Sequence, residues 1–274
     1  MKITPWVAGI EFAEGPTFDN DGNLYFVNYV RNGTIGRRTP EGRVEIWIEI
    51  EGGQANGLKC DSQNRLIVAD YLGKRLLRIS QQRVVEVLAD QFEGRPFLGL
   101  NDVCLDAAEN IYFSDPTGST AENPFGAVYF FSRDGDLRLV DSGLAFPNGL
   151  AVSMDQKRLL VAETYTNRIL EYTLAGPGRQ VAKRVFHQFP NATVDGIDFD
   201  VNGNLWVARW TNGTVDVIQP DGSLGSSIDM GGDQVTNLTW WDEDLYVTIA
   251  GRNSIYRVGA GVRGAYGKPA ISRS

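Results

Sequence analysis

Six polar side chains recur along the sequence at nearly regular intervals, and some of them could together hold a metal ion. They lie 42 to 47 residues apart and are Glu14, Asn56, Asn101, Asn148, Asp195 and Asn237. Two carboxylates and two amides form the candidate metal site: Glu14, Asn101, Asn148 and Asp195. Carboxylates that share a narrow space repel each other unless a cation accompanies them. This oxygen-rich set suits Ca²⁺ or Mg²⁺ first, and Mn²⁺, Fe²⁺ or Zn²⁺ less well.

An asparagine at such a position can instead hydrogen-bond neighbouring backbone groups. This simpler role is our interpretation of Asn56 and Asn237.

The segments after these positions predict the strands that must carry them. Apolar residues alternate there with a period of two, as in Leu58 and Cys60, which is typical of a strand. A second strand is predicted about ten residues after each recurring residue, as in "LYFVNY" and "LIVADY", following turns such as "DNDGN". A third strand and a weaker fourth strand complete each unit of about 40 to 47 residues.

Six such units without a convincing helix predict an all-β fold, a six-bladed β-propeller with four antiparallel strands in each blade. We expect a single propeller domain over residues 1–274. The last unit ends after its third strand, and the N-terminal segment "KITPWVAG" is predicted to supply the fourth strand that closes the ring. An array of β-sandwiches is the alternative, but it would not require a polar residue at one fixed position of each unit.

A propeller places the six recurring residues at one mouth of its central channel, because the first strand of each blade lines the axis. The second strand returns to the same face, so its last residue is expected beside the ring: Asn28, Asp70, Asp115, Glu163 and Arg209. Aromatic residues stand just beyond these ends: Tyr29, Tyr71, Tyr165 and Trp210. The predicted rim is aromatic and polar, with loop packing as an alternative role for the aromatic residues.

Four segments also carry a family resemblance over most of the chain, from Glu11 to about Tyr256. "EGPTFDNDGNLYFVN", "LNDVCLDAAENIYFSDP", "FPNGLAVSMDQKRLLVAET" and "VDGIDFDVNGNLWVARW" resemble segments of the SMP-30/gluconolactonase/LRE-like proteins. The resemblance implies a six-bladed propeller in which Glu14, Asn148 and Asp195 bind the metal. It implies that Asn101 binds the metal or its water. Animal members of this family carry an arginine two positions before that asparagine, where this sequence has Gly99.

The chemistry that these residues predict is metal-assisted hydrolysis. The single histidine, His187, lies away from other candidate groups, which argues against catalytic triads and histidine-rich zinc sites. A divalent ion can polarise a lactone carbonyl and hold a water near a carboxylate. Asp195 is predicted to be both a metal ligand and the general base, with a role as ligand alone as the alternative. Asn101 and Asn148 are predicted to orient substrate and ion.

A sugar-acid lactone, opened to the aldonic acid, is the substrate that this combination predicts first. Candidate substrate contacts are Asp102, Asp115, Thr117, Tyr29, Tyr165, Arg209 and Trp210. Glu163 and Arg209 could instead pair with each other in a structural salt bridge. Three alternatives remain: calcium-dependent hydrolysis of organophosphates, strictosidine-synthase-like condensation, and metal binding without catalysis. The presence of Glu14 and Asp195 argues against the second of these.

Composition and charge set the remaining expectations. The net charge of -8 over 274 residues argues against a nucleic-acid partner. No apolar segment is long enough to span a bilayer, and the first residues lack the apolar run of a signal peptide. Cys60 and Cys104 are expected to be buried free thiols. We therefore expect a cytoplasmic monomer whose partner is a small-molecule lactone.

Overall fold

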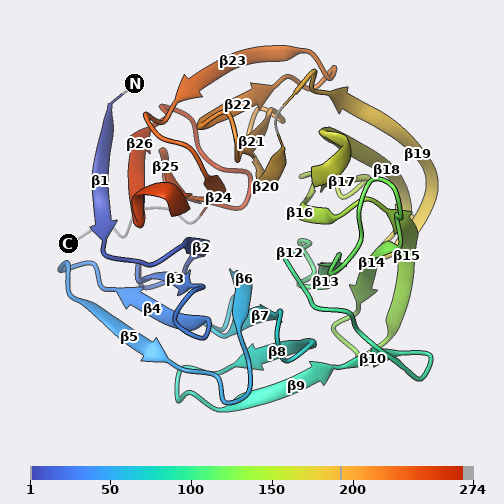
Figure 1. Ribbon diagram of the computed structural model, residues 1–274, viewed down its shortest axis with the longest axis horizontal. Coiled ribbons are helices and arrows are strands. Elements are labelled where there is room, and N and C mark those ends of the chain that lie inside the picture. The colour runs from blue at the N-terminus through green and yellow to red at the C-terminus, as the bar shows by residue number, and fades with distance from the viewer. Residues whose placement is uncertain (1, 192, 268–274) are drawn as a thin grey trace.

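The computed structural model describes residues 2–191 and 193–267, and its strands form six sheets around a central axis (Figure 1). Each sheet has four antiparallel strands, and the first strand of each blade lies nearest the axis. The prediction of a six-bladed β-propeller is therefore confirmed. In the predicted domain range of 1–274, residues 1, 192 and 268–274 lie outside the described residues.

The strands follow one another outward from the axis in each blade. Blade 1 contains β2 (Ala13–Phe18), β3 (Leu24–Asn28), β4 (Thr34–Arg38) and β5 (Val44–Ile48). Blade 2 contains β6 (Ala55–Cys60), β7 (Leu66–Asp70), β8 (Arg75–Ile79) and β9 (Val85–Ala89). Blade 3 contains β12 (Val103–Leu105), β13 (Ile111–Asp115), β14 (Gly126–Phe131) and β15 (Leu137–Leu144). A short hairpin of β10 (Gln91–Phe92) and β11 (Arg95–Pro96) precedes blade 3.

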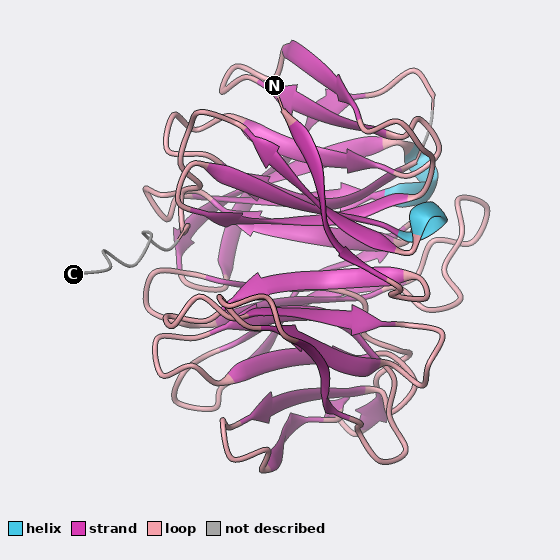
Figure 2. Ribbon diagram, turned by 90° about the vertical axis from the view of Figure 1, so that its left-hand side faces the viewer, coloured by secondary structure: helices cyan, strands magenta, loops and turns pink. Residues whose placement is uncertain are grey.

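The second half of the chain repeats this order. Blade 4 contains β16 (Pro147–Val152), β17 (Arg158–Glu163), β18 (Arg168–Gly176) and β19 (Arg179–Gln188). Blade 5 contains β20 (Val194–Phe199), β21 (Leu205–Arg209), β22 (Thr214–Ile218) and β23 (Leu224–Asp229). Blade 6 contains β24 (Val235–Trp241), β25 (Asp244–Ile249), β26 (Ser254–Gly259) and β1 (Ile3–Ala8). Two short 3₁₀ helices, η1 (Thr164–Thr166) and η2 (Ala250–Arg252), lie on one face of the disc (Figure 2).

The N-terminal strand closes the ring as predicted. β1 pairs antiparallel with β26, with Ile3 opposite Val258 and Ala8 opposite Ser254. The blade that ends the chain thus takes its outermost strand from the beginning of the chain. This pairing links the two ends of the sequence and fixes the sixth blade beside the first.

In four blades, the turn between the first and second strands depends on an acidic residue five positions after the recurring polar residue. Asp19 Oδ1 accepts hydrogen bonds of 2.9 Å from the backbone N–H groups of Asp21 and Asn23. Corresponding bonds form in three other blades, at Asp61, Asp106 and Asp200. These carboxylates hold tight turns and are not available for chemistry.

The core lies between neighbouring blades, because each sheet buries both of its faces. All five residues of β3, β7, β13 and β21 are buried. Cys60 and Cys104 are buried free thiols, as predicted. Among the described residues, no helix is long and apolar enough to cross a membrane.

The inner strands form a closed ring in the order β2, β6, β12, β16, β20, β24, and β24 contacts β2 again. Four of the recurring polar residues are followed by a glycine: Gly15, Gly57, Gly149 and Gly196. A Cβ atom at Gly57 would lie 2.6 Å from Cα of Asp102, and one at Gly149 would lie 2.7 Å from Cα of Gly196. Glycine is therefore required where neighbouring inner strands approach most closely.

Candidate functional site

A cavity of about 340 Å³ opens at the mouth of the channel where the first strands begin. Polar side chains form its floor: Glu14, Asn56, Asn101, Asn148, Thr164, Thr193 and Asp195. Aromatic side chains form its wall: Phe12, Tyr29, Tyr71, Phe146, Tyr165 and Trp210. We call this space the aromatic cavity. Its size is within the range of small-molecule sites in proteins.

The floor residues are aimed at the axis by irregularities in the inner strands. The pairing register shifts next to Glu14, Asn148 and Asp195, where the strand carries extra residues relative to its partner. The same shift occurs next to Asn56 and Asn237. Such bulges re-aim a side chain that would otherwise point into the sheet stack. The shift occurs in five of the six blades and explains why a polar side chain recurs at a fixed position there. In blade 3, Asn101 precedes β12, whose pairing with β13 has no shift.

Hydrogen bonds fix the floor side chains. Glu14 Oε2 accepts the backbone N–H of Gly15 at 3.1 Å and also bonds the Asn237 amide. The Asn148 amide donates to Thr164 Oγ1 at 3.3 Å and bonds Asp195. Asn237 does not line the cavity, and its amide donates to Asp102 at 3.1 Å. Its position agrees with the structural role predicted for it, whereas Asn56 lies in the cavity lining.

The two floor carboxylates carry an electrostatic penalty. Burial, followed by the charge of Asp102, raises the pKa of Glu14 from 4.5 to about 8. Burial, followed by the charges of Glu14 and Asp102, raises the pKa of Asp195 well above its ordinary value. No lysine, arginine or histidine stands among the residues that line the aromatic cavity. The protein itself therefore provides no cation there to offset the two carboxylates.

This donor set fits a hard divalent cation. Among the described residues, no group of three or more His, Cys, Asp or Glu side chains is placed to hold a metal. The floor instead combines two carboxylates with amide groups, and Ca²⁺ readily accepts amide and water oxygens as ligands. A bound cation would also offset the repulsion that raises both pKa values.

Seven of the eleven predicted site residues line the aromatic cavity: Glu14, Asn101, Asn148, Asp195, Tyr29, Tyr165 and Trp210. The aromatic ones contact other rings of the wall. The Phe12 ring lies 5.4 Å from that of Tyr29 and 5.5 Å from that of Trp210, between centroids. The Phe146 ring lies 5.0 Å from that of Tyr165.

Asp115 and Thr117, predicted to bind sugar hydroxyls, do not line the cavity. The Asp115 carboxylate accepts backbone N–H groups of Leu98 and Gly99 at 2.8 to 3.0 Å. Thr117 Oγ1 donates to the Gly99 carbonyl at 2.8 Å. Both side chains thus hold the loop before Asn101 in place, and their positions do not support the predicted contact.

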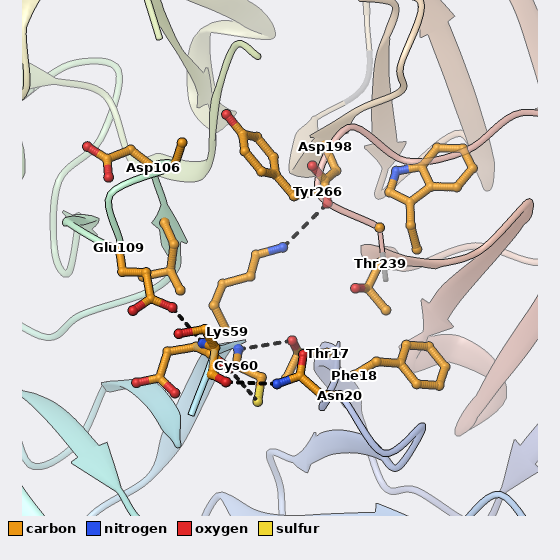
Figure 3. A pocket seen from close by; sticks show the side chains of 16 residues that line it. Thr17, Phe18, Asn20, Lys59, Cys60, Asp106, Glu109, Asp198, Thr239 and Tyr266 are labelled. Carbon is orange, nitrogen blue, oxygen red and sulfur yellow. Dashed lines mark hydrogen bonds and ion pairs between the residues drawn. The ribbon is translucent and has the colours of Figure 1, made fainter. Parts of the chain in front are cut away.

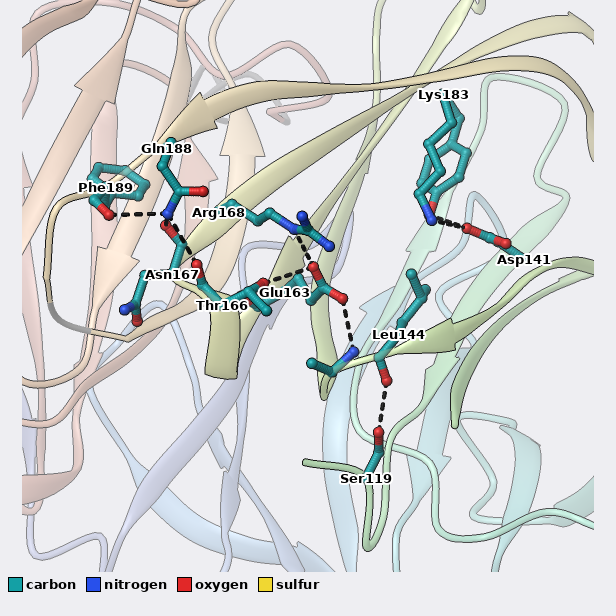
Figure 4. Close-up of polar contacts among 12 residues, drawn as sticks. Ser119, Asp141, Leu144, Glu163, Thr166, Asn167, Arg168, Lys183, Gln188 and Phe189 are labelled. Atoms are coloured by element: carbon teal, nitrogen blue, oxygen red, sulfur yellow. Dashed lines mark hydrogen bonds and ion pairs between the residues drawn. The ribbon is translucent and has the colours of Figure 1, made fainter. Parts of the chain in front are cut away.

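Arg209 and Glu163 also point away from the cavity, and the predicted pair between them is wrong. Arg209 pairs with Asp216 at 2.6 Å and lies over the Phe189 ring. Glu163 pairs with Arg168 and accepts the backbone N–H of Ala145 at 2.7 Å (Figure 4). Successive strand residues point to opposite sides. The residues just beyond the second strands reach the cavity, so the last strand residues face the gap between blades.

Asp102 also lies outside the cavity lining, deeper in the channel. Its carboxylate accepts the backbone N–H of Val103 at 2.8 Å and the Asn237 amide. Burial raises the pKa of Asp102 to about 6, although the nearby charge of Lys59 opposes the shift.

A second cavity, of about 270 Å³, lies at the opposite mouth, where the first strands end (Figure 3). We call it the lysine cavity, because the ammonium of Lys59 lies in it, 3.5 Å from Asp198. Burial alone would lower the pKa of Lys59, and the charges of Asp198 and Asp102 raise it above its usual value. Asp198 and Asp102 therefore have a cationic partner within the protein, the ammonium of Lys59.

Four residues of the aromatic cavity were absent from the sequence prediction: Phe12, Phe146, Thr164 and Thr193. Phe12 and Phe146 each stand two positions before a recurring residue, and so does Thr193. The repeat therefore contained a signal for them. Thr164 follows a second strand directly, as Tyr29 and Trp210 do.

Comparison with known proteins gives consistent findings. The sequence model of the SMP-30/gluconolactonase/LRE-like region matches residues 12–251. Diisopropyl-fluorophosphatase of Loligo vulgaris is 34% identical over 248 residues, which cover 81% of this chain and 78% of that protein. Gluconolactonase of Zymomonas mobilis is 26% identical over 281 residues, which cover 91% and 78% of the two chains.

The fold also matches a solved structure. A gluconolactonase from Xanthomonas campestris superposes with a TM-score of 0.83 and 23% identity, covering 96% of this chain and 89% of the other. This likeness supports the arrangement of six blades.

Proposed function

Because the chain belongs to the SMP-30/gluconolactonase/LRE-like family, we propose that it is a metal-dependent lactonase with its active site at the floor of the aromatic cavity. The observation that carries this proposal is the pair of buried carboxylates, Glu14 and Asp195, beside amide ligands in an open cavity that no cationic side chain lines. Such a pair is costly to keep unless it serves a ligand.

Three side chains would hold the ion directly, Glu14, Asn148 and Asp195, with Asn101 as a ligand or as a contact to a bound water. Ca²⁺ is the first choice, followed by Mg²⁺, Mn²⁺, Fe²⁺ or Zn²⁺. When bound, the ion supplies Lewis-acid polarisation of the lactone carbonyl.

Asp195 is proposed to act as the general base. Its carboxylate accepts a proton from the attacking water as the new C–O bond forms at the carbonyl carbon. The ring C–O bond then breaks, and the proton passes to the ring oxygen, so the lactone and one water become a hydroxy acid. The amides of Asn101 and Asn148 orient the substrate. Coordination lowers the basicity of a carboxylate, and a role for Asp195 as ligand alone is the alternative.

The substrate class that the sequence predicts is a sugar-acid lactone, and the similarity to a protein named gluconolactonase supports it. A second candidate is hydrolysis of organophosphates, which the 34% identity to diisopropyl-fluorophosphatase favours. We further propose a cytoplasmic monomer, because the closed ring buries its blade edges without a partner chain and both cysteines are free.

The test is acid release by chelator-treated protein. Aldono-1,4- and 1,5-lactones, simple γ- and δ-lactones and one fluorophosphate are assayed with and without each of the five ions. Metal-restored hydrolysis of a lactone supports the proposal, and selective hydrolysis of the fluorophosphate supports the second candidate. Metal binding without turnover of any compound, in folded protein, would indicate a non-enzymatic role.

A further inference from the structure

The wall of the aromatic cavity contains two strained phenylalanines. Phe12 has φ of 59° and Phe146 has φ of 61°, which is the left-handed backbone region. Bulky side chains rarely adopt this conformation, because it carries a steric cost that the surrounding structure must offset. Both residues stand two positions before a floor residue, Glu14 in one case and Asn148 in the other.

The propeller architecture does not require this strain. The carbonyl of Phe12 accepts the N–H of Tyr29, and that of Phe146 accepts the N–H of Thr164. Gln54, Thr193 and Gln234 directly precede the first strands of other blades. Their carbonyls accept the corresponding N–H groups of Tyr71, Trp210 and Ala250. Gln234 has φ of 59°, whereas neither Gln54 nor Thr193 is among the residues with positive φ. The left-handed conformation thus occurs at three of these five positions, and at two of them it places an aromatic ring in the cavity.

The two phenylalanines lie across the axis from each other. β2 and β16, which follow them, are separated by two inner strands in either direction around the ring of six (Figure 1). Phe12 continues into a row of rings through Trp210 on one side and Tyr29 on the other. Phe146 pairs with Tyr165. The space above the floor is thus bounded by aromatic carbon on opposite sides.

The cavity also lacks a positive side chain that could bind an anionic substituent. The two charged groups that line it are the carboxylates of Glu14 and Asp195. Gly99 cannot be replaced by a cationic residue without rearrangement, because a Cβ atom there would lie 2.5 Å from Thr117 Oγ1 and 2.9 Å from the Tyr71 carbonyl oxygen. A substrate with a phosphate or carboxylate substituent would find no positive side chain here.

Few polar groups of the cavity above the floor amides remain for a row of hydroxyls. Thr164 Oγ1 donates to the Val194 carbonyl at 2.8 Å and accepts the Asn148 amide. The hydroxyls of Tyr29 and Tyr71 bond each other. Thr193 Oγ1 is buried without a hydrogen-bond partner among the described residues. The hydroxyls of a polyhydroxylated ring that face the wall instead of the floor would lie against aromatic carbon, where they are unfavourably placed.

We propose that the aromatic cavity selects an uncharged lactone with an aromatic or branched alkyl substituent. The substituent is held between two aromatic pairs, Phe12 and Trp210 on one side and Phe146 and Tyr165 on the other. This inference rests on the proposed lactonase function and replaces the sugar-acid lactone with a less polar substrate.

The test compares γ-phenyl-γ-butyrolactone with D-glucono-1,5-lactone and 6-phosphoglucono-1,5-lactone. We expect kcat/KM for the phenyl lactone to be at least about tenfold higher than for gluconolactone, and the phosphorylated lactone to be the poorest substrate. Phe12→Ala and Phe146→Ala should each raise KM for the phenyl lactone about tenfold with little change in kcat. Phe125→Ala, at an exposed phenylalanine outside the cavity, is the matched control.

A higher kcat/KM for either sugar lactone, or an unchanged KM in both cavity variants, overturns this inference while the lactonase proposal stands. If no lactone is hydrolysed, calorimetry with 3-phenylcyclopentanone, a ketone that cannot be hydrolysed, tests the aromatic selection independently of the lactonase proposal. Binding to wild-type protein that both cavity variants lose supports the aromatic selection, and absence of binding overturns it. Circular dichroism shows whether each variant is folded.

Discussion

The two mouths of the channel are built from the same inner strands but balance their charges differently. In β20, Asp195 lies at the aromatic cavity and Asp198 lies three residues later at the lysine cavity. Asp198 has the ammonium of Lys59 as its partner, whereas burial and repulsion raise the pKa of Asp195. A buried carboxylate that the protein pairs with its own cation is structural. A buried carboxylate that lies beside a like charge in an open cavity is a candidate catalytic or metal-binding group.

The largest expected effect separates these two carboxylates in one strand. Asp195→Asn should lower kcat for the best lactone by about 100-fold or more, because it removes both the proposed base and one ligand charge. Asp198→Asn, three residues away, should leave kcat within about threefold. Steady-state kinetics with saturating metal measures both. Unchanged activity in Asp195→Asn would exclude this residue as the base.

For the stability of the metal-free protein, the damaging substitution is expected at the lysine cavity and not at the aromatic cavity. Lys59→Met leaves Asp198 and Asp102 without their cation, so the free energy of unfolding should fall by about 1–3 kcal/mol. Glu14→Gln removes one of two repelling groups and should stabilise the chelator-treated protein. Urea unfolding measures both variants, with Lys157→Met at an exposed lysine as control. Destabilisation by Glu14→Gln in chelator would show that repulsion does not dominate the floor.

The pH dependence of stability should differ with and without metal. The folded metal-free protein holds a proton on Glu14 up to about pH 8, whereas the unfolded chain releases it near 4.5. The free energy of unfolding without metal should therefore fall as pH rises between these values. Bound metal would offset this loss, so the Tm difference between calcium-loaded and chelator-treated protein should widen from pH 5 to 8. A constant difference would contradict the raised pKa.

The smallest expected effect concerns strain in the aromatic wall. Phe12→Gly and Phe12→Ala remove the same ring, but glycine adopts the left-handed conformation without steric cost. The glycine variant should be more stable than the alanine variant by about 1 kcal/mol. The same pair at Phe125, which is not among the positive-φ residues, should show no such advantage for glycine. Thermal unfolding of the four variants measures the difference.

The sequence was sufficient to predict the fold, because one turn and one polar position recur in every unit. The same repeat identified Glu14, Asn148 and Asp195, since the bulge that aims them occurs at a constant place in the first strand. Asn101 holds the corresponding place in the sequence, before β12. The closing strand followed from the missing fourth strand of the last unit, and its pairing with β26 confirms it.

Side-chain direction at the ends of the second strands was the part that sequence did not resolve. Arg209 and Trp210 are adjacent, and their positions predict the same end of the blade for both. They nevertheless face opposite sides, and Asp216 and Phe189 engage Arg209 between the blades. The partners that decide such directions come from other strands and loops. Local sequence patterns do not contain that information.

Calcium titration by calorimetry tests the central claim most directly, that the unpaired floor carboxylates hold a metal. Chelator-treated wild-type protein, the double variant Glu14→Gln/Asp195→Asn and Asp198→Asn would be compared near pH 8. We predict that wild-type protein and Asp198→Asn bind one calcium ion at the floor and that the double variant, still folded by circular dichroism, loses that ion. Equal calcium binding by all three proteins would contradict the proposed site.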